Sequence, residues 1–104
     1  RRAQRRKCIM AKGAQRGLVK SLAREWGPKG VRVNAVATSA VTPALEAFMR
    51  REPHMREHLV RRAALRRFGQ SEPDIGGVVN FLIGPDSAFV SGQTLAVNGG
   101  ALMI

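Results

Sequence analysis

A long amphipathic pattern followed at once by a valine-rich run constrains the fold of this chain more than any other feature. Between Met10 and Trp26, apolar side chains recur at every fourth position, and this spacing predicts a helix. The Gly-Pro-Lys-Gly segment at 27–30 is expected to end that helix. Residues 31–37 then predict a strand. They are almost continuously apolar after Asn34, which is typical of a strand covered on both faces in a parallel sheet.

The rest of the chain continues this alternation of helix and strand. Ser71 is expected to cap a helix that runs to Leu82, with Asp74 completing the capping-box spacing. The pattern predicts a loop at 38–43, helical pieces at 44–52 and 54–65 on either side of Pro53, and a strand at 94–98. This order predicts an α/β fold with a parallel sheet of two strands and about four helices. Two strands leave two open edges, so we expect only a part of a larger sheet.

Several phrases of the sequence identify a family. The segment 66–100 reads RRFGQSEPDIGGVVNFLIGPDSAFVSGQTLAVNGG, and the segment 22–37 reads LAREWGPKGVRVNAVA. In this order and spacing they resemble the C-terminal half of a classical short-chain dehydrogenase/reductase, over residues 8–104. The resemblance implies a doubly wound Rossmann sheet that binds NAD or NADP. It also implies hydride transfer between the nicotinamide and an alcohol or carbonyl substrate.

The same resemblance assigns the candidate catalytic residues. Lys12 matches the family's lysine, which binds the nicotinamide ribose and assists a tyrosine one helical turn earlier. Cys8 stands where that tyrosine belongs, and the chain contains no tyrosine. A thiol is far shorter than a phenol, so a proton that a tyrosine would exchange lies several ångströms beyond the sulfur, outside the roughly 2.6–3.2 Å reach of direct transfer. We therefore expect Cys8 to be an inert small residue rather than an acid or a redox thiol.

The cofactor contacts depart from the family pattern as well. Thr38 and Ser39 replace a Pro-Gly pair after the first strand, and the loop is one residue shorter before Pro43. Val41 and Thr42 are the nearest matches for the contacts to the nicotinamide amide and the phosphates, and Thr38 opens the same loop. In the last turn, Asn98 stands where an aspartate is common.

A glycine-rich pyrophosphate loop after a strand is missing from the sequence. We therefore expect a truncated, inactive oxidoreductase fragment that does not bind NAD(P) by itself. A second chain supplying the front half is the alternative. Residues 1–7 form a basic leader expected to be disordered or non-native, and 8–104 the C-terminal half of the cofactor domain. The resemblance also implies a substrate lid at 44–65 and homo-oligomers of the complete protein. The arginines of the lid would suit an acidic or acyl-carrier substrate, or simply form a solvated face.

The charge raises a different class of function. The chain has 18 basic and 7 acidic residues, a formal charge of +11, which favours binding to nucleic acid or another acidic partner. A basic binding module on a remnant fold is therefore the alternative, although no aromatic residues interleave with the basic ones to stack bases. His54 and His58 lack an evident third metal ligand. One cysteine favours a reducing, cytoplasmic setting, and no apolar run is long enough to span a bilayer.

Overall fold

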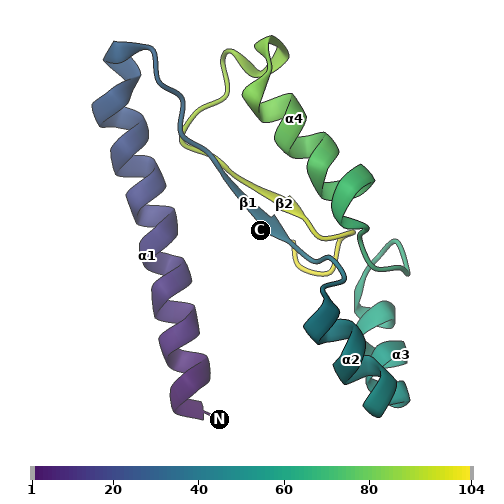
Figure 1. Ribbon diagram of the computed structural model, residues 1–104. Coiled ribbons are helices and arrows are strands. Elements are labelled where there is room, and N and C mark those ends of the chain that lie inside the picture. Colours follow the sequence, from purple (N-terminus) through teal and green to yellow (C-terminus); the bar gives the residue numbers. More distant parts are fainter. Residues whose placement is uncertain (1, 104) are drawn as a thin grey trace. The chain divides into compact units, whose positions relative to one another are not determined.

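A computed structural model describes residues 2–103. The chain alternates helices with two short strands (Figure 1). Its regular elements are α1 (Arg2–Trp26), β1 (Ala35–Thr38), α2 (Pro43–Arg51), α3 (Pro53–Arg62), a π-helical turn at Ser71–Gly76, α4 (Gly77–Ile83) and β2 (Thr94–Val97). Short 3₁₀ turns follow α1 at Gly27–Lys29 and α4 at Pro85–Ser87. The predicted α/β class is confirmed.

The two strands form one parallel pair. Ala35 donates its N–H to the Gln93 carbonyl at 2.8 Å, and Ser39 donates to the Val97 carbonyl at 3.1 Å. Both strands advance in the same direction between these two bonds, which is the parallel arrangement. Within the described residues the sheet has the order β1-β2 and no further strand, as the sequence predicted.

The chain divides into two compact units. Within residues 2–103, the first unit comprises α1 and the chain up to Ala35, together with Ser87–Leu95. The second unit comprises Val36–Asp86 and the residues from Ala96 onward.

Helix α1 of the first unit is longer than its apolar stripe predicted. It begins at Arg2 rather than near Met10, so residues 2–7 of the expected basic leader form its first turns. No Gly or Pro interrupts Arg2–Lys12, and Ala, Gln, Arg and Lys are good helix formers. Arg1 and Ile104, which bound the predicted segments, lie outside the described residues. The predicted stop is confirmed, because Gly30 adopts a φ of +79° and donates its N–H to the Gly27 carbonyl.

Residues 32–34, which follow α1, are held mainly by side-chain hydrogen bonds to the loop at 87–91. Arg32 donates from Nη1 to the carbonyl and the hydroxyl of Ser87 at 2.8 and 2.9 Å, and Ser87 is completely buried. The Val33 N–H donates to the Ser91 hydroxyl, and the Asn34 amide donates to the Val90 carbonyl. One backbone bond joins the two segments before Ala35, from the Gly92 N–H to the Val33 carbonyl at 2.7 Å. Side chains make the other contacts named here, which explains why β1 is shorter than the strand predicted at 31–37.

In the second unit, α2 and α3 follow each other with a single-residue break. Thr42 caps α2 by accepting from the Leu45 N–H at 3.2 Å, and Pro43 occupies the first turn. Pro53 begins α3 instead of merely separating two helices. Helix α3 ends at Arg62, earlier than the predicted residue 65, because the chain turns there and Leu65 donates its N–H to the Gly99 carbonyl.

The turn before α4 is built differently from the prediction. Ser71 does not cap the helix with its side chain, and the residues from Ser71 to Gly76 form a π-helical turn. Asp74 instead accepts from the Gln70 N–H at 2.7 Å through its carboxylate. The predicted end of this helix at the Gly-Pro-Asp segment is confirmed, since α4 closes at Ile83.

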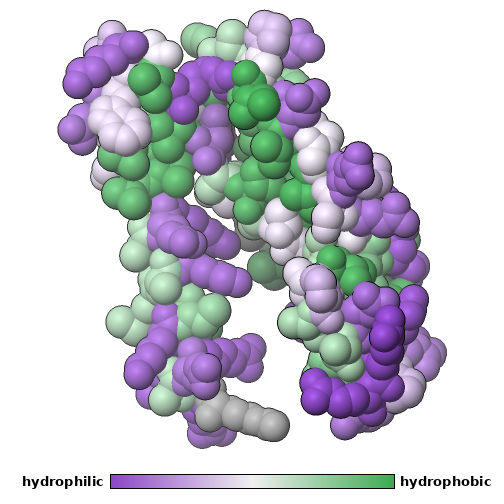
Figure 2. Space-filling model, in the orientation of Figure 1, coloured by the Kyte–Doolittle hydropathy of each residue, from purple (hydrophilic) through white to green (hydrophobic). Residues whose placement is uncertain are grey.

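Few apolar side chains are fully covered. Among the described residues, Met49, Ala63 and Leu82 make up the buried core, and all three belong to the second unit. Leu18 on α1 is 57% exposed, and Phe81 on α4 is 44% exposed. Figure 2 shows hydrophobic side chains on the surface of the C-terminal half of α1 and hydrophilic ones over α2 and α3. The apolar stripe that predicted α1 is therefore largely uncovered by the residues that the structure describes.

Candidate functional site

Cys8 and Lys12 lie on the same face of α1 in the first unit. They are four positions apart, or roughly 6 Å along the helix axis, which places one side chain above the other. Both are exposed, and the Cys8 thiol is free. Within residues 2–103, the Lys12 ammonium has no hydrogen-bond or ion-pair partner. This arrangement offers an accessible cation next to a small thiol.

The three predicted cofactor residues of the loop lie in the second unit, at the carboxyl end of β1. Thr38 is the last residue of the strand and is exposed. Val41 donates its N–H to the Gly69 carbonyl at 3.1 Å, so this donor is already used. The Thr42 hydroxyl accepts the capping bond of α2 and keeps its own hydrogen as a donor. The loop therefore presents the Thr38 and Thr42 hydroxyls and the Val41 carbonyl.

A close backbone contact fixes this loop. Ala40 and Gly69 form a parallel bridge, and Gly69 donates its N–H to the Ser39 carbonyl at 3.2 Å. A Cβ atom at Gly69 would lie 2.9 Å from that carbonyl oxygen. Gly69 is thus the residue that allows the Arg-Phe-Gly turn to approach the loop after β1.

Asn98 organises the glycine turn after β2. Its amide nitrogen donates to the Leu102 carbonyl at 2.8 Å, and its amide oxygen accepts from the Gly100 N–H at 3.0 Å. Gly99 and Gly100 have φ values of +61° and +77°, which favour glycine. An ionised aspartate could accept but not donate, so the amide satisfies the Leu102 carbonyl in a way that an aspartate would not.

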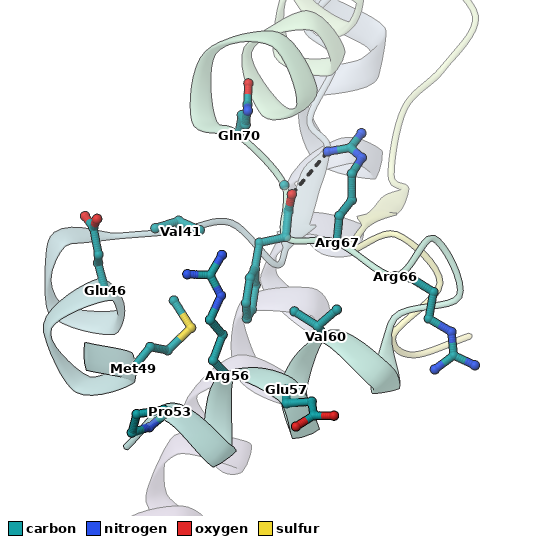
Figure 3. A pocket seen from close by; sticks show the side chains of 12 residues that line it. Val41, Glu46, Met49, Pro53, Arg56, Glu57, Val60, Arg66, Arg67 and Gln70 are labelled. Atoms are coloured by element: carbon teal, nitrogen blue, oxygen red, sulfur yellow. Dashed lines mark hydrogen bonds between the residues drawn. The ribbon is translucent and has the colours of Figure 1, made fainter. Parts of the chain in front are cut away.

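A pocket of about 650 Å³ lies in the second unit, between α2, α3 and the turn at 66–70 (Figure 3). Its apolar lining comes from Val41, Met49, Pro53, Val60 and Phe68. The Arg56 side chain extends from α3 into the space between Met49 and Val41, whereas Glu57 and Arg66 point away from it. Of the predicted site residues only Val41 borders this pocket. The sequence singled out the arginines of this segment without distinguishing Arg56.

The two histidines of α3 are exposed, and His54 Nε2 lies 3.5 Å from Glu52 Oε2. In the described part of the chain, no three His, Cys, Asp or Glu side chains gather as metal ligands. No helix among residues 2–103 is both long and apolar enough to cross a membrane.

Comparison with known proteins covers almost the whole chain. A family model described as enoyl-(acyl carrier protein) reductase matches residues 3–101. The chain is 39% identical over 92 residues to 2-dehydro-3-deoxy-D-gluconate 5-dehydrogenase of Bacillus subtilis, and 41% identical over 90 residues to 12alpha-hydroxysteroid dehydrogenase of a Clostridium species. These matches cover 88% and 86% of this chain but only 36% and 35% of the two relatives. The chain therefore spans about a third of the length of the relatives that it matches.

A solved structure shows the same fold. A short-chain dehydrogenase/reductase from Brucella melitensis superposes with a TM-score of 0.77 at 34% identity. The superposition covers 89% of this chain and 36% of the other.

Proposed function

Because the chain belongs to the short-chain dehydrogenase/reductase family, we propose that it forms part of an oxidoreductase that transfers hydride between NAD(P) and an alcohol or carbonyl compound. The observation that carries this proposal is the pair Cys8 and Lys12, one turn apart on α1, in a chain whose family match runs from residue 3 to residue 101. We propose that residues 8–104 are the C-terminal half of the cofactor domain.

Each of the two units, taken by itself, offers groups of the kind that a nicotinamide cofactor binds. Lys12 is an exposed ammonium without a partner among the described residues, so it can donate to the ribose hydroxyls. The Val41 carbonyl can accept from the carboxamide, although the Val41 N–H is occupied by Gly69. Thr38 and Thr42 would supply hydroxyl donors to a phosphate. The bound cofactor would supply the hydride.

Cys8 does not fit the proton-transfer role. Its thiol lies on the correct helix turn, but it ends several ångströms short of the place that a tyrosine hydroxyl would reach. Lys12 would still bind and orient, but no side chain at position 8 would hold the transferred proton against the substrate oxygen. We therefore propose that this chain, with Cys8, supports cofactor binding within a complete fold but little turnover.

The exposed apolar faces support a larger fold around this chain. Leu18 and Phe81 lie on α1 and α4, and a helix that carries an apolar stripe buries it against a sheet or another helix. We propose that further strands, from the same polypeptide or from a second one, cover these faces. We also propose that the complete protein is a homo-oligomer in the reducing cytoplasm, where an unpaired cysteine such as Cys8 is common.

A joined chain tests the proposed function. The present chain is fused behind the N-terminal part of the Bacillus subtilis dehydrogenase, and turnover is measured on 2-dehydro-3-deoxy-D-gluconate and a panel of secondary alcohols. A positioned general acid contributes roughly a hundredfold to ten-thousandfold, so Cys8→Tyr is expected to raise turnover by about a hundredfold or more. Cys8→Phe, which has the bulk without the hydroxyl, is the matched control and should stay slow. Equal rates for Cys8→Tyr and Cys8→Phe would refute the assignment of position 8.

A further inference from the structure

The acidic residues of the pocket between α2 and α3 are already paired. Glu46 Oε1 lies 3.1 Å from Arg50 Nη2, and Glu57 Oε1 lies 2.6 Å from Arg61 Nη2. Both are i,i+4 pairs along their own helices. Neither carboxylate is therefore paired with Arg56, which lines the same pocket.

The other arginines that line the pocket also have partners. Arg67 forms two hydrogen bonds to Asp74, and Arg66 Nη1 donates to the Arg61 carbonyl at 2.6 Å. Among the described charged residues that line the pocket, Arg56 alone has no hydrogen bond or ion pair. Its side chain nevertheless extends into the pocket, whereas Arg66 points away from it (Figure 3).

Arg56 is exposed, and apolar side chains form the part of the pocket wall beside it. Met49 is 5% exposed, and Val60 and Phe68 are half-buried at the wall of the same pocket. A volume of about 650 Å³ falls within the range of roughly 300–1,000 Å³ that small-molecule sites occupy. The pocket thus combines a hydrocarbon-lined space with a single unpaired cation, which suits a ligand with one anionic end and an apolar body.

We propose that this pocket binds a small amphipathic monocarboxylate, whose carboxylate pairs with Arg56 and whose hydrocarbon part lies against Met49, Val60 and Phe68. A guanidinium presents two parallel N–H donors that match the two oxygens of a carboxylate. Among the described residues that line the pocket, the single unpaired cation balances the charge of a monoanion but leaves a phosphate dianion with one uncompensated charge. The pocket lies in the segment that the family resemblance assigns to the substrate lid, so the inference names a substrate class for the proposed function and rests on it. Binding of the carboxylate itself is measured without a cofactor and without hydride transfer.

The test is a titration of the full chain with ligands. Binding is measured through the NMR amide resonances of α2, α3 and residues 66–70. Octanoate, octanol and octyl phosphate are the probes, since they share a hydrocarbon body and differ in the head group. The variants are Arg56→Gln and Arg56→Lys. Arg62→Gln is the matched control, because Arg62 lies on the same helix, is exposed and does not line the pocket.

Octanoate is expected to bind more tightly than octanol and octyl phosphate. Arg56→Gln removes a hydrogen-bonded charge pair with the octanoate carboxylate, so it should weaken octanoate binding by roughly tenfold to a hundredfold. Octanol has no charged head group, so its binding should stay unchanged. Arg56→Lys should fall between, because it keeps the charge and loses the planar fork. The unliganded spectrum of each variant reports whether the second unit remains folded.

Three outcomes would overturn the proposal. One is octanoate binding that Arg56→Gln leaves unchanged in a folded chain. Another is an equal loss in Arg62→Gln, which would reveal general attraction to a basic surface. The third is the absence of resonance shifts around the pocket with octanoate, or equal shifts with octanol, in the wild-type chain.

Discussion

Asp74 and Arg67 form a two-point ion pair across the turn that precedes α4. Arg67 Nη1 lies 2.6 Å from Asp74 Oδ2, and Arg67 Nη2 lies 2.9 Å from Asp74 Oδ1. The same carboxylate accepts from the Gln70 N–H. These contacts link residues 67, 70 and 74, so the carboxylate of Asp74 holds the π-helical turn against the Arg-Phe-Gly segment.

The first prediction concerns the pH dependence of this pair. The hydrogen bond from Arg67, followed by that from the Gln70 N–H, lowers the pKa of Asp74 from 3.8 to about 2. A carboxyl whose folded pKa is lowered stabilises the folded state above its unfolded pKa, and that contribution is lost as the pH falls through the folded pKa. Thermal unfolding of the chain and of Asp74→Asn, followed by circular dichroism, should therefore differ above about pH 4.

The difference between the two chains should shrink steadily from about pH 4 to about pH 2. The wild-type chain should have the higher midpoint above this window, by a small margin because the pair is partly exposed to solvent. Glu72→Gln is the matched control, since Glu72 lies in the same turn and forms no ion pair in the described part of the chain. A constant difference across the whole pH range would contradict the role of the Asp74 carboxylate.

The second prediction concerns two glycines of the second unit. Gly100 has a φ of +77°, and a Cβ there would lie 2.7 Å from the Ala64 Cβ, so Gly100→Ala should destabilise the unit. Left-handed backbone at a non-glycine residue alone costs about 1–3 kcal/mol of unfolding free energy. Gly77 opens α4 with a φ of −60°, and a Cβ there meets nothing within 4 Å. Gly77→Ala should therefore stabilise the unit by about 0.4–1 kcal/mol.

Urea unfolding of the two variants, followed by amide resonances of α3 and α4, measures both effects with one method. A lower unfolding free energy for Gly100→Ala together with a higher one for Gly77→Ala would support the described turn after β2. A Gly100→Ala chain as stable as the wild type would contradict the positive φ at that residue and its approach to Ala64.

The order of elements could be predicted because local chemistry determines it. The end of α1 at Trp26, the stops at Gly27 and Gly84, and the strand at 94–98 all follow from spacing and turn residues, and the structure agrees with each within a residue or a turn. The fold class followed from this order, because a helix between two strands allows them to pair in parallel.

The predictions that were wrong depend on side-chain hydrogen bonds that periodicity does not encode. The strand predicted at 31–37 loses its first residues to side chains that bind the loop around Ser87 and Val90. Ser71 was expected to cap α4, but the Asp74 carboxylate takes the nearby N–H of Gln70 instead. The pattern of periodicity contains no signal for either choice.

The candidate site was predictable only through the family. Nothing in the spacing alone gives Lys12 a role, because an exposed lysine on a helix is ordinary. Arg56 could not be distinguished from the sequence, because Glu52 stands four positions before it, just as Glu46 precedes Arg50 and Glu57 precedes Arg61. In the structure Glu52 lies 3.5 Å from His54 instead. Its direction into the pocket required the structure.

Cofactor affinity of the joined chain tests the central claim most directly, because it needs no knowledge of the substrate. NADH and NADPH binding is measured by nucleotide fluorescence in the joined chain, in Lys12→Met and in Lys20→Met, a matched control farther along the same exposed helix. If Lys12 holds the ribose, Lys12→Met should weaken binding roughly tenfold to a hundredfold, while Lys20→Met leaves it unchanged. Equal affinities in all three chains, or no binding by the joined chain, would contradict the claim that α1 carries a short-chain dehydrogenase/reductase cofactor contact.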